Sequence, residues 1–236
     1  MRVEAQPAYV LHSRPWRETS LLLEIFSRDH GRVGLLARGV RSARARLPRA
    51  TLEPFQLLQV DWAGQGELPN LRGVETMGPS RRLTNDALLS GLYVNELLVR
   101  LTARHDPHPG LFDRYANLLA ELADPGPLAW NLRRFERDLL AELGYGLQLE
   151  QEAESGEPLD TEAEYVYVPE QGPLRASAHH RGKIRGAALL ALRNDTLPST
   201  ADLAALRRLL RAVIGAHVGE RGLRAWRVLA GAMRKN

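Results

Sequence analysis

The sequence predicts an α+β protein whose first 80 residues are β-rich and whose remainder is mainly helical. Short apolar runs separated by turn residues follow one another from residue 8 to about residue 78, as in a small antiparallel β protein. After Pro79 the apolar residues recur every three to four positions, which is the period of amphipathic helices. Proline-containing breaks divide this second part into segments that suit an antiparallel bundle.

Five strands are expected in the β-rich part, over residues 9–12, 21–26, 33–37, 55–62 and 71–77. Gly31 ends a hairpin turn between the second and third strands, because glycine adopts positive φ freely. Pro15 is expected to interrupt the chain after the first strand, since proline lacks the N–H that a β ladder uses. Five antiparallel strands in about 75 residues favour an oligonucleotide-binding (OB) barrel. A five-stranded SH3-like barrel is the alternative, and strand spacing does not separate the two.

The helical part is expected to begin at Thr84 or Asn85 and to reach Leu101 in its first helix. Further helices are expected over residues 111–122, 128–143, 184–193, 201–218 and 223–233. Between them, residues 148–182 combine clustered acids with a short β-like run and are interpreted as an inserted, weakly packed finger. The predicted domains are therefore a barrel over residues 1–80, a helical bundle over residues 81–147 and 183–236, and the insertion over residues 148–182.

Composition narrows the classes of function. The chain has 236 residues, a formal charge of +4 and a pI near 9.7, which permits binding to nucleic acid or another acidic surface. Because there is no cysteine, disulfides, thiolate catalysis and thiolate zinc sites are excluded. No apolar run reads as a signal peptide or a membrane span, so a cytosolic protein without membrane contact is expected.

Arginine is concentrated in two parts of the sequence. Residues 31–49 hold six arginines and no acid, and they combine an alternating strand with a loop of small residues that ends near Pro48. Several arginines together suit the phosphates of a nucleic-acid backbone. The alternative is a solvated loop that only aids solubility. With the second arginine series near the C-terminus, the predicted DNA-binding residues are Arg14, Arg17, Arg32, Arg38, Arg41, Arg44, Arg46, Arg49, Arg207, Arg208, Arg211, Arg224 and Arg227.

Three aromatic residues near the basic loop are candidates for stacking on bases. They are Trp16, Trp62 and Phe26. The alternative for each is a place in the barrel core, which is where small barrels more often use aromatic side chains.

No motif indicates catalysis. The sequence contains no phosphate-binding glycine loop, no nucleophile elbow and no His-Glu-x-x-His, and its carboxylates gather in the predicted finger. The histidine pairs His105/His108 and His179/His180 supply too few ligands for a metal site. His217 lies on an apolar helix face and is interpreted as a core residue. We expect no catalytic residue and no cofactor.

Several motifs occur in an order that resembles the bacterial DNA repair family RecO, from about residue 8 to the C-terminus. They are the segments 14–20, 26–32, 37–41, 52–55, 93–97, 133–140 and 143–145. The resemblance implies an OB domain, a helical domain, and sequence-independent binding and annealing of single- and double-stranded DNA. It also implies partnership with RecR, and often RecF, in placing RecA on strands coated by single-strand binding protein, without covalent chemistry.

The chain departs from the resemblance at the zinc finger that many members of this family carry. The positions that match the four cysteine ligands are Glu152, Ser155, Ala176 and His179. Serine and alanine do not hold structural zinc, so no zinc is expected. The finger is then expected to be held by packing alone.

Two other functions compete with a DNA-annealing mediator. A protein-interaction scaffold would use an exposed apolar face of the bundle and bind DNA only secondarily. A nuclease would need a metal-binding carboxylate cluster beside the arginines, and the acids of this sequence lie elsewhere.

Overall fold

The computed structural model describes residues 2–42, 47, 49–78, 82–219 and 222–225. The chain forms two compact units. The barrel unit comprises Met1–Asp124 and the segment that begins at Leu223, and the helix–finger unit comprises Pro125–Gly222. The division between units thus falls inside the region expected to be one bundle, and the predicted domain boundaries stay a prediction.

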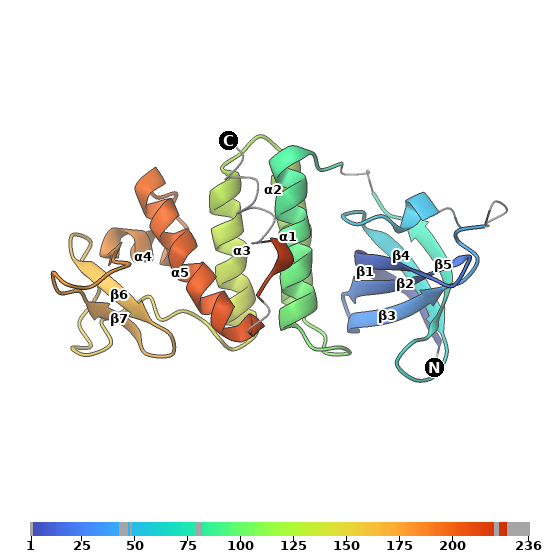
Figure 1. The fold of residues 1–236 in the computed structure, drawn as a ribbon, viewed down its shortest axis with the longest axis horizontal. Helices are drawn as coiled ribbons and strands as arrows, with labels where there is room; N and C mark the ends of the chain where they lie inside the picture. The colour runs from blue at the N-terminus through green and yellow to red at the C-terminus, as the bar shows by residue number, and fades with distance from the viewer. Residues whose placement is uncertain (1, 43–46, 48, 79–81, 220–221, 226–236) are drawn as a thin grey trace. The chain divides into compact units, whose positions relative to one another are not determined.

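The barrel is built from five strands, as predicted (Figure 1). They are β1 (Arg2–Trp16), β2 (Ser20–Ser27), β3 (Gly31–Ala37), β4 (Leu58–Ala63) and β5 (Asn70–Thr76), with a short 3₁₀ turn at Arg49–Leu52. They close in the order β1-β2-β3-β5-β4, and β4 returns to pair with β1. All pairings are antiparallel except the contact of β3 with β5 at Leu36 and Asn70. This Greek-key order is that of the OB barrel, so the SH3-like alternative is set aside.

The first strand is longer than predicted. It continues through Pro15, which pairs with Leu21 of β2, so the predicted interruption is wrong. The pairing of β1 with β4 runs only from Arg2 to Ala8. The last residues of β1 therefore lie along an edge, and an edge is where a strand tolerates proline.

Alternation along the strands fills the barrel. Val33, Leu35 and Ala37 of β3 are buried, as are Leu58 and the other inward residues of β4. Gly31 has φ 62°, which confirms its expected place at the end of the β2–β3 hairpin. Together these side chains form the main apolar cluster of the barrel unit.

Two helices complete the described part of the barrel unit: α1 (Asn85–Leu101) and α2 (Pro109–Ala123). Tyr115 of α2 packs edge-on against Tyr9 of β1, with ring centroids 5.0 Å apart. Asn95 of α1 accepts a hydrogen bond from the Tyr115 hydroxyl at 2.6 Å and donates to the Leu11 carbonyl at 3.0 Å. Leu11 lies at a register shift in β1, so Asn95 satisfies a carbonyl at an irregular point of the ladder.

The described part of the helix–finger unit contains three helices and a small sheet. The helices are α3 (Leu128–Glu142), α4 (Gly186–Arg193) and α5 (Thr200–Val218). The sheet has the order β7-β6-β8, with β6 at Glu164–Val168, β7 at Gly172–Arg175 and β8 at Ile184–Arg185. Gly144 follows the end of α3 with φ 82°, and the Ser199 side chain caps α5 by accepting a hydrogen bond from the Asp202 amide.

Candidate nucleic-acid interface

A groove of about 780 Å³ opens on the barrel between the β1–β2 turn, the end of β3 and the β4–β5 loop. It is lined by Trp16, Arg17, Glu18, Thr19, Ser20, Leu36, Arg38, Gly39 and Leu68. OB folds bind oligonucleotides on the face of strands 2 and 3, between the β1–β2 and β4–β5 loops. The groove therefore occupies the ligand face of the fold.

The chain after β3 forms one wall of this groove because it is anchored to the β1–β2 turn. The Arg41 amide donates to the Thr19 carbonyl at 2.9 Å, and the Arg41 guanidinium donates to the Arg17 carbonyl at 3.3 Å. Val40, which lies between Gly39 and Arg41, is buried, and Gly39 takes φ 71° where the chain bends. Arg41 thus holds the wall, while Arg17 and Arg38 line the hollow itself.

The three stacking candidates differ in exposure. Trp62 and Phe26 are buried in the barrel unit, so their prediction as stacking surfaces is wrong. Trp62 belongs to the apolar cluster inside the barrel, whereas Phe26 packs against Phe112 and Tyr115 of α2. Both rings gain more from burial than from solvent contact. Trp16 is 41 % exposed and lines the groove. It alone of the three presents a ring to a ligand there.

The predicted DNA-binding residues of the barrel unit fall into different settings. Arg14, Arg17, Arg38, Arg41 and Arg49 are exposed. Arg49 lies 3.9 Å from Glu53, an exposed pairing of little energetic weight. Arg44 and Arg46 lie outside the described residues.

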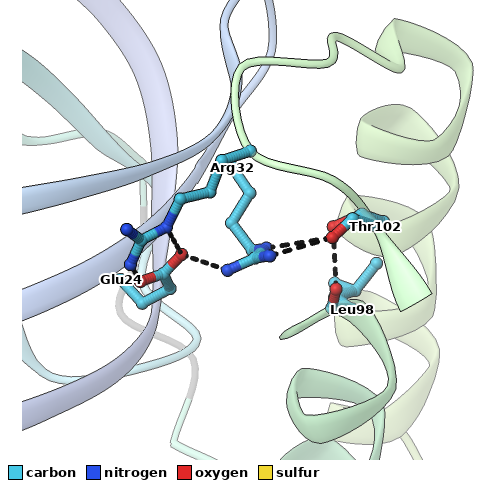
Figure 2. Close-up of polar contacts among 5 residues, drawn as sticks. Glu24, Arg32, Leu98 and Thr102 are labelled. Atoms are coloured by element: carbon cyan, nitrogen blue, oxygen red, sulfur yellow. Dashed lines mark hydrogen bonds and ion pairs between the residues drawn. The ribbon is translucent and has the colours of Figure 1, made fainter. Parts of the chain in front are cut away.

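The guanidinium of Arg32 is engaged by other groups of the protein (Figure 2). It forms an ion pair with Glu24 and donates to the Thr102 carbonyl at the end of α1 at 2.9 Å. Only 14 % of its side chain is exposed. These contacts join the barrel to the α1–α2 loop, and we therefore leave Arg32 out of the DNA-contacting surface.

The C-terminal arginines are divided between the two compact units. Arg207, Arg208 and Arg211 lie exposed on α5 in the helix–finger unit, and the i, i+4 spacing places Arg207 and Arg211 on one side of the helix. Arg224 is exposed in the barrel unit, where its amide donates to Glu96 at 2.8 Å. Arg227 lies outside the described residues.

The arginines of α3 are engaged within the helix–finger unit. Arg133 and Glu136 are both buried and lie 2.5 Å apart, one turn of helix from each other. Arg134 and Arg137 both bind Asp195, at 2.9 and 3.0 Å. Burial opposes ionisation of Asp195, but the bonds and charges of these two arginines outweigh it and lower its pKa. The charged residues of this motif therefore stabilise the unit.

The finger contains a polar cluster around Glu152 and Ser155, two of the four positions that the resemblance aligns with zinc ligands. Glu152 is buried, and its carboxylate accepts from Ser155 Oγ, Tyr165 OH and Arg175 Nε, each at 2.9 Å. The Ser155 hydrogen bond is the largest cause of a lowered Glu152 pKa, with Tyr165 and Arg175 acting in the same direction against desolvation. The expectation that packing alone holds the finger is wrong, because a carboxylate joins three of its side chains.

The other histidine and zinc-like positions stay apart. Ala176 bonds through its amide to the Glu164 carbonyl, and His179 is exposed. His217 is half-buried and stacks on Tyr145 with ring centroids 4.0 Å apart, which differs from the core setting expected for it. Within the described residues, no group of three or more His, Cys, Asp or Glu is arranged to hold a metal ion.

Sequence reasoning missed the structural roles of Glu24, which pairs with two arginines, and of Glu152, which binds Ser155, Tyr165 and Arg175. Glu24 stands inside the apolar run Leu21–Phe26, and a charge in such a run is the available signal. Glu152 was singled out only as a failed zinc ligand. Two of its hydrogen-bond partners, Tyr165 and Arg175, lie 13 and 23 positions away, so no local pattern indicates the cluster.

The comparisons with known proteins agree with the fold. A family model described as Recombination protein O N terminal matches residues 1–79, and one described as Recombination protein O C terminal matches residues 82–227. The DNA repair protein RecO of Xanthomonas oryzae pv. oryzae (strain PXO99A) is 45 % identical over 240 residues, covering 100 % of both chains. DNA repair protein RecO of Xanthomonas campestris pv. campestris (strain B100) and of Stenotrophomonas maltophilia (strain K279a) are each 46 % identical, with 97 % of both chains covered.

The family models together cover nearly the whole chain, and the relatives are matched from end to end. No helix among the described residues is both long and apolar enough to span a membrane. The barrel order, the helical region and the full-length matches lead to one conclusion: this chain belongs to the RecO family of DNA repair proteins.

Proposed function

We propose that this protein binds single- and double-stranded DNA without sequence specificity, anneals complementary strands and, with RecR, helps to load RecA on DNA coated by single-strand binding protein. The observation that carries the DNA-binding part is the groove that joins Trp16, Arg17 and Arg38 on the ligand face of an OB barrel. RecF is a further partner in this scheme. The protein acts in the cytoplasm, associated with the nucleoid, and needs no cofactor.

The groove has the chemistry of a single-strand site. Arg17 and Arg38 carry positive charge against one lining carboxylate, that of Glu18, so a phosphate backbone is favoured. Trp16 offers an exposed ring on which a base of any identity can stack. Neither interaction reads base edges, and binding should therefore be independent of sequence.

Annealing requires that a second strand be held near the first with its charge reduced. The exposed arginines of α5, Arg207, Arg208 and Arg211, supply a second basic surface on the other compact unit. Cations beside each backbone lower the repulsion between strands while the bases stay available for pairing. We assign annealing to the groove and this α5 surface acting together. The process involves no covalent chemistry.

The test is binding of fluorescent single strands and duplexes across a salt series, with wild type, Trp16→Ala and Arg38→Gln. Each groove variant should weaken single-strand binding by roughly fivefold or more for all sequences alike. Arg72→Gln is the matched control, because Arg72 is an exposed β5 arginine outside the groove lining. Unchanged affinity in both groove variants would refute the assignment.

An interaction scaffold is the second candidate function. Leu88 and Leu92 lie one turn apart on α1, and their exposed fractions are 37 % and 44 %. Exposed apolar residues on one helix face suit contact with a protein partner. Leu88→Ser with Leu92→Ser should then weaken RecR binding while leaving DNA affinity unchanged. If the double variant kept wild-type affinity for both RecR and DNA, this α1 face would not be a partner-binding surface.

A further inference from the structure

We propose that Arg104, a residue of the α1–α2 loop, is a DNA-phosphate contact that extends the barrel groove, and that Glu24 positions it. This inference rests on the proposed DNA-binding function and names a contact outside the barrel strands. It also assigns a function to a second hollow of about 240 Å³ on the same unit.

The second hollow continues the first. Its lining residues are His12, Arg14, Leu22, Leu23, Glu24, Gly34, Glu67, Leu68 and Arg104. Leu68 of the β4–β5 loop lines both hollows, so the two adjoin at that side chain. A strand that passes Trp16 and Arg38 and crosses Leu68 would reach Arg14 and Arg104.

A glycine in β3 makes room for Arg104. A Cβ atom at Gly34 would stand 3.2 Å from Arg104 Nη2 and 3.4 Å from Cζ. The guanidinium therefore lies directly over the strand backbone at a position where any side chain would crowd it. Glycine inside a strand often marks such a close approach, and here the approaching group is a cation facing the groove.

Glu24 fixes this cation with two bonds. Arg104 Nη2 donates to Glu24 Oε2 at 2.6 Å, and Arg104 Nε donates to Glu24 Oε1 at 3.2 Å. The side chain of Glu24 is 14 % exposed and that of Arg104 is 42 % exposed. A guanidinium has five N–H donors, so three stay available for an incoming phosphate.

The charges around the hollow leave a positive remainder. Glu24 pairs with Arg32 (Figure 2), and the same carboxylate also pairs with Arg104. Arg14 and Glu67 line the same hollow. Three arginines against two glutamates give a net charge of +1. The single carboxylate of Glu24 therefore positions Arg104 without cancelling the attraction for a phosphate.

The loop that carries Arg104 is held on the barrel on both sides of that residue. The Arg32 guanidinium bonds the Thr102 carbonyl, and the His105 amide donates to the Arg32 carbonyl at 3.0 Å. A Cβ atom at Gly31 would lie 2.1 Å from the Asp106 carbonyl oxygen, so this glycine lets the loop backbone lie against β3. Arg104 is thus pre-organised before any ligand binds.

The experiment uses the full chain, with oligothymidylates of about 4 and about 12 nucleotides, the range of site sizes for one OB fold. Arg104→Gln should weaken binding of the longer strand roughly fivefold and reduce the salt slope by about 0.7, the loss of one phosphate contact. The shorter strand, which Trp16 and Arg38 can hold alone, should lose less affinity. Arg104→Lys should recover most of the salt slope because it restores the charge.

Gly34→Ala provides an independent variant. It should weaken binding of the longer strand in wild type by displacing the guanidinium, and it should add nothing in the Arg104→Gln background. Arg72→Gln is the control for loss of one exposed arginine of the barrel unit. Thermal unfolding of each variant identifies any that lost the fold. If Arg104→Gln is one of them, the single variants Arg104→Lys and Gly34→Ala decide whether Arg104 contacts DNA.

The outcomes separate this inference from the function beneath it. If Arg38→Gln weakens binding but Arg104→Gln leaves affinity and salt slope at wild-type values, the Arg104 assignment is overturned and the groove stands. If Arg104→Gln and Arg104→Lys lower affinity equally with no change of slope, Arg104 is only a structural ion pair and the inference fails. If neither Arg38→Gln nor Arg104→Gln changes binding, the proposed function itself fails.

Discussion

Two regions of the molecule are each organised around a nearly buried glutamate, and the two glutamates have different roles. Glu24 in the barrel binds Arg32 and Arg104, and one of those arginines stays substantially exposed beside a groove. Glu152 in the finger accepts hydrogen bonds from Ser155, Tyr165 and Arg175. The first carboxylate positions a cation for a ligand, and the second cross-links its own segment. A buried acid paired with arginine therefore does not by itself indicate a binding site; the setting of the arginine decides.

The largest expected effect comes from removing the carboxylate of the finger. Glu152→Ala leaves the Tyr165 hydroxyl and Arg175 without their shared acceptor, and the melting temperature should fall by on the order of 5 °C. Glu154→Ala, at an exposed position of the same segment, is the control and should melt like wild type. An equal melting temperature for both variants would break the comparison, because Glu152 would then cross-link nothing.

Stacking in the groove should give the next largest effect. Trp16→Ala should reduce single-strand affinity about tenfold and duplex affinity less, since paired bases are not free to stack. Leu68→Ala, which trims the same groove without removing an aromatic ring, should cost less. Fluorescence anisotropy with matched single strands and duplexes measures both. Equal losses for the two DNA forms would contradict a stacking contribution from Trp16.

Acid should loosen the finger. The pKa of Glu152 is lowered in the folded state, so its stabilisation is complete above the pKa of an unfolded glutamate, about 4.3. That contribution is lost as pH falls from this value through the lower folded pKa. Hydrogen exchange of the β6–β7 amides should accelerate in this window in wild type. In Glu152→Gln the acceleration should be absent, and its persistence would assign it to another group.

The smallest expected effect concerns the exposed acid near Arg104. Glu67→Gln removes a carboxylate that lines the second hollow, and single-strand affinity at low salt should rise about twofold. The gain should disappear at high salt, where screening shortens the reach of surface charges. A twofold loss instead would mean that Glu67 helps to hold the site. Measuring single-strand affinity at two salt concentrations and one temperature distinguishes the gain from the loss.

Much of the fold was predictable because local pattern and tertiary structure agree. Alternation in β3 and β4, the glycine at Gly31 and the Ser199 cap all require only neighbouring residues. The continuation of β1 through Pro15 was not predictable, because it depends on where β4 stops pairing with β1. The exposure of Trp16 and the burial of Trp62 likewise depend on barrel closure, which the sequence spacing does not reveal.

The candidate site divides in the same way. The arginine-rich segment after β3 was recognisable from composition, and one of its residues, Arg38, lines the groove. Arg104 was not singled out, because it lies 80 positions from its partner Glu24 and belongs to a helical connection. Gly34, a glycine between Val33 and Leu35 in a strand pattern, was the available sign that another group approaches there.

The most direct test of the central claim is photo-crosslinking of an oligonucleotide that carries 5-iodouracil, followed by mass spectrometric mapping of the attached peptides. The groove account predicts that the main crosslink falls on the peptide containing Trp16, and that Arg38→Gln reduces its yield at a fixed DNA concentration. Crosslinks confined to α5 or other helical peptides, with none in residues 14–20, would contradict it and transfer the DNA-binding surface to the helix–finger unit.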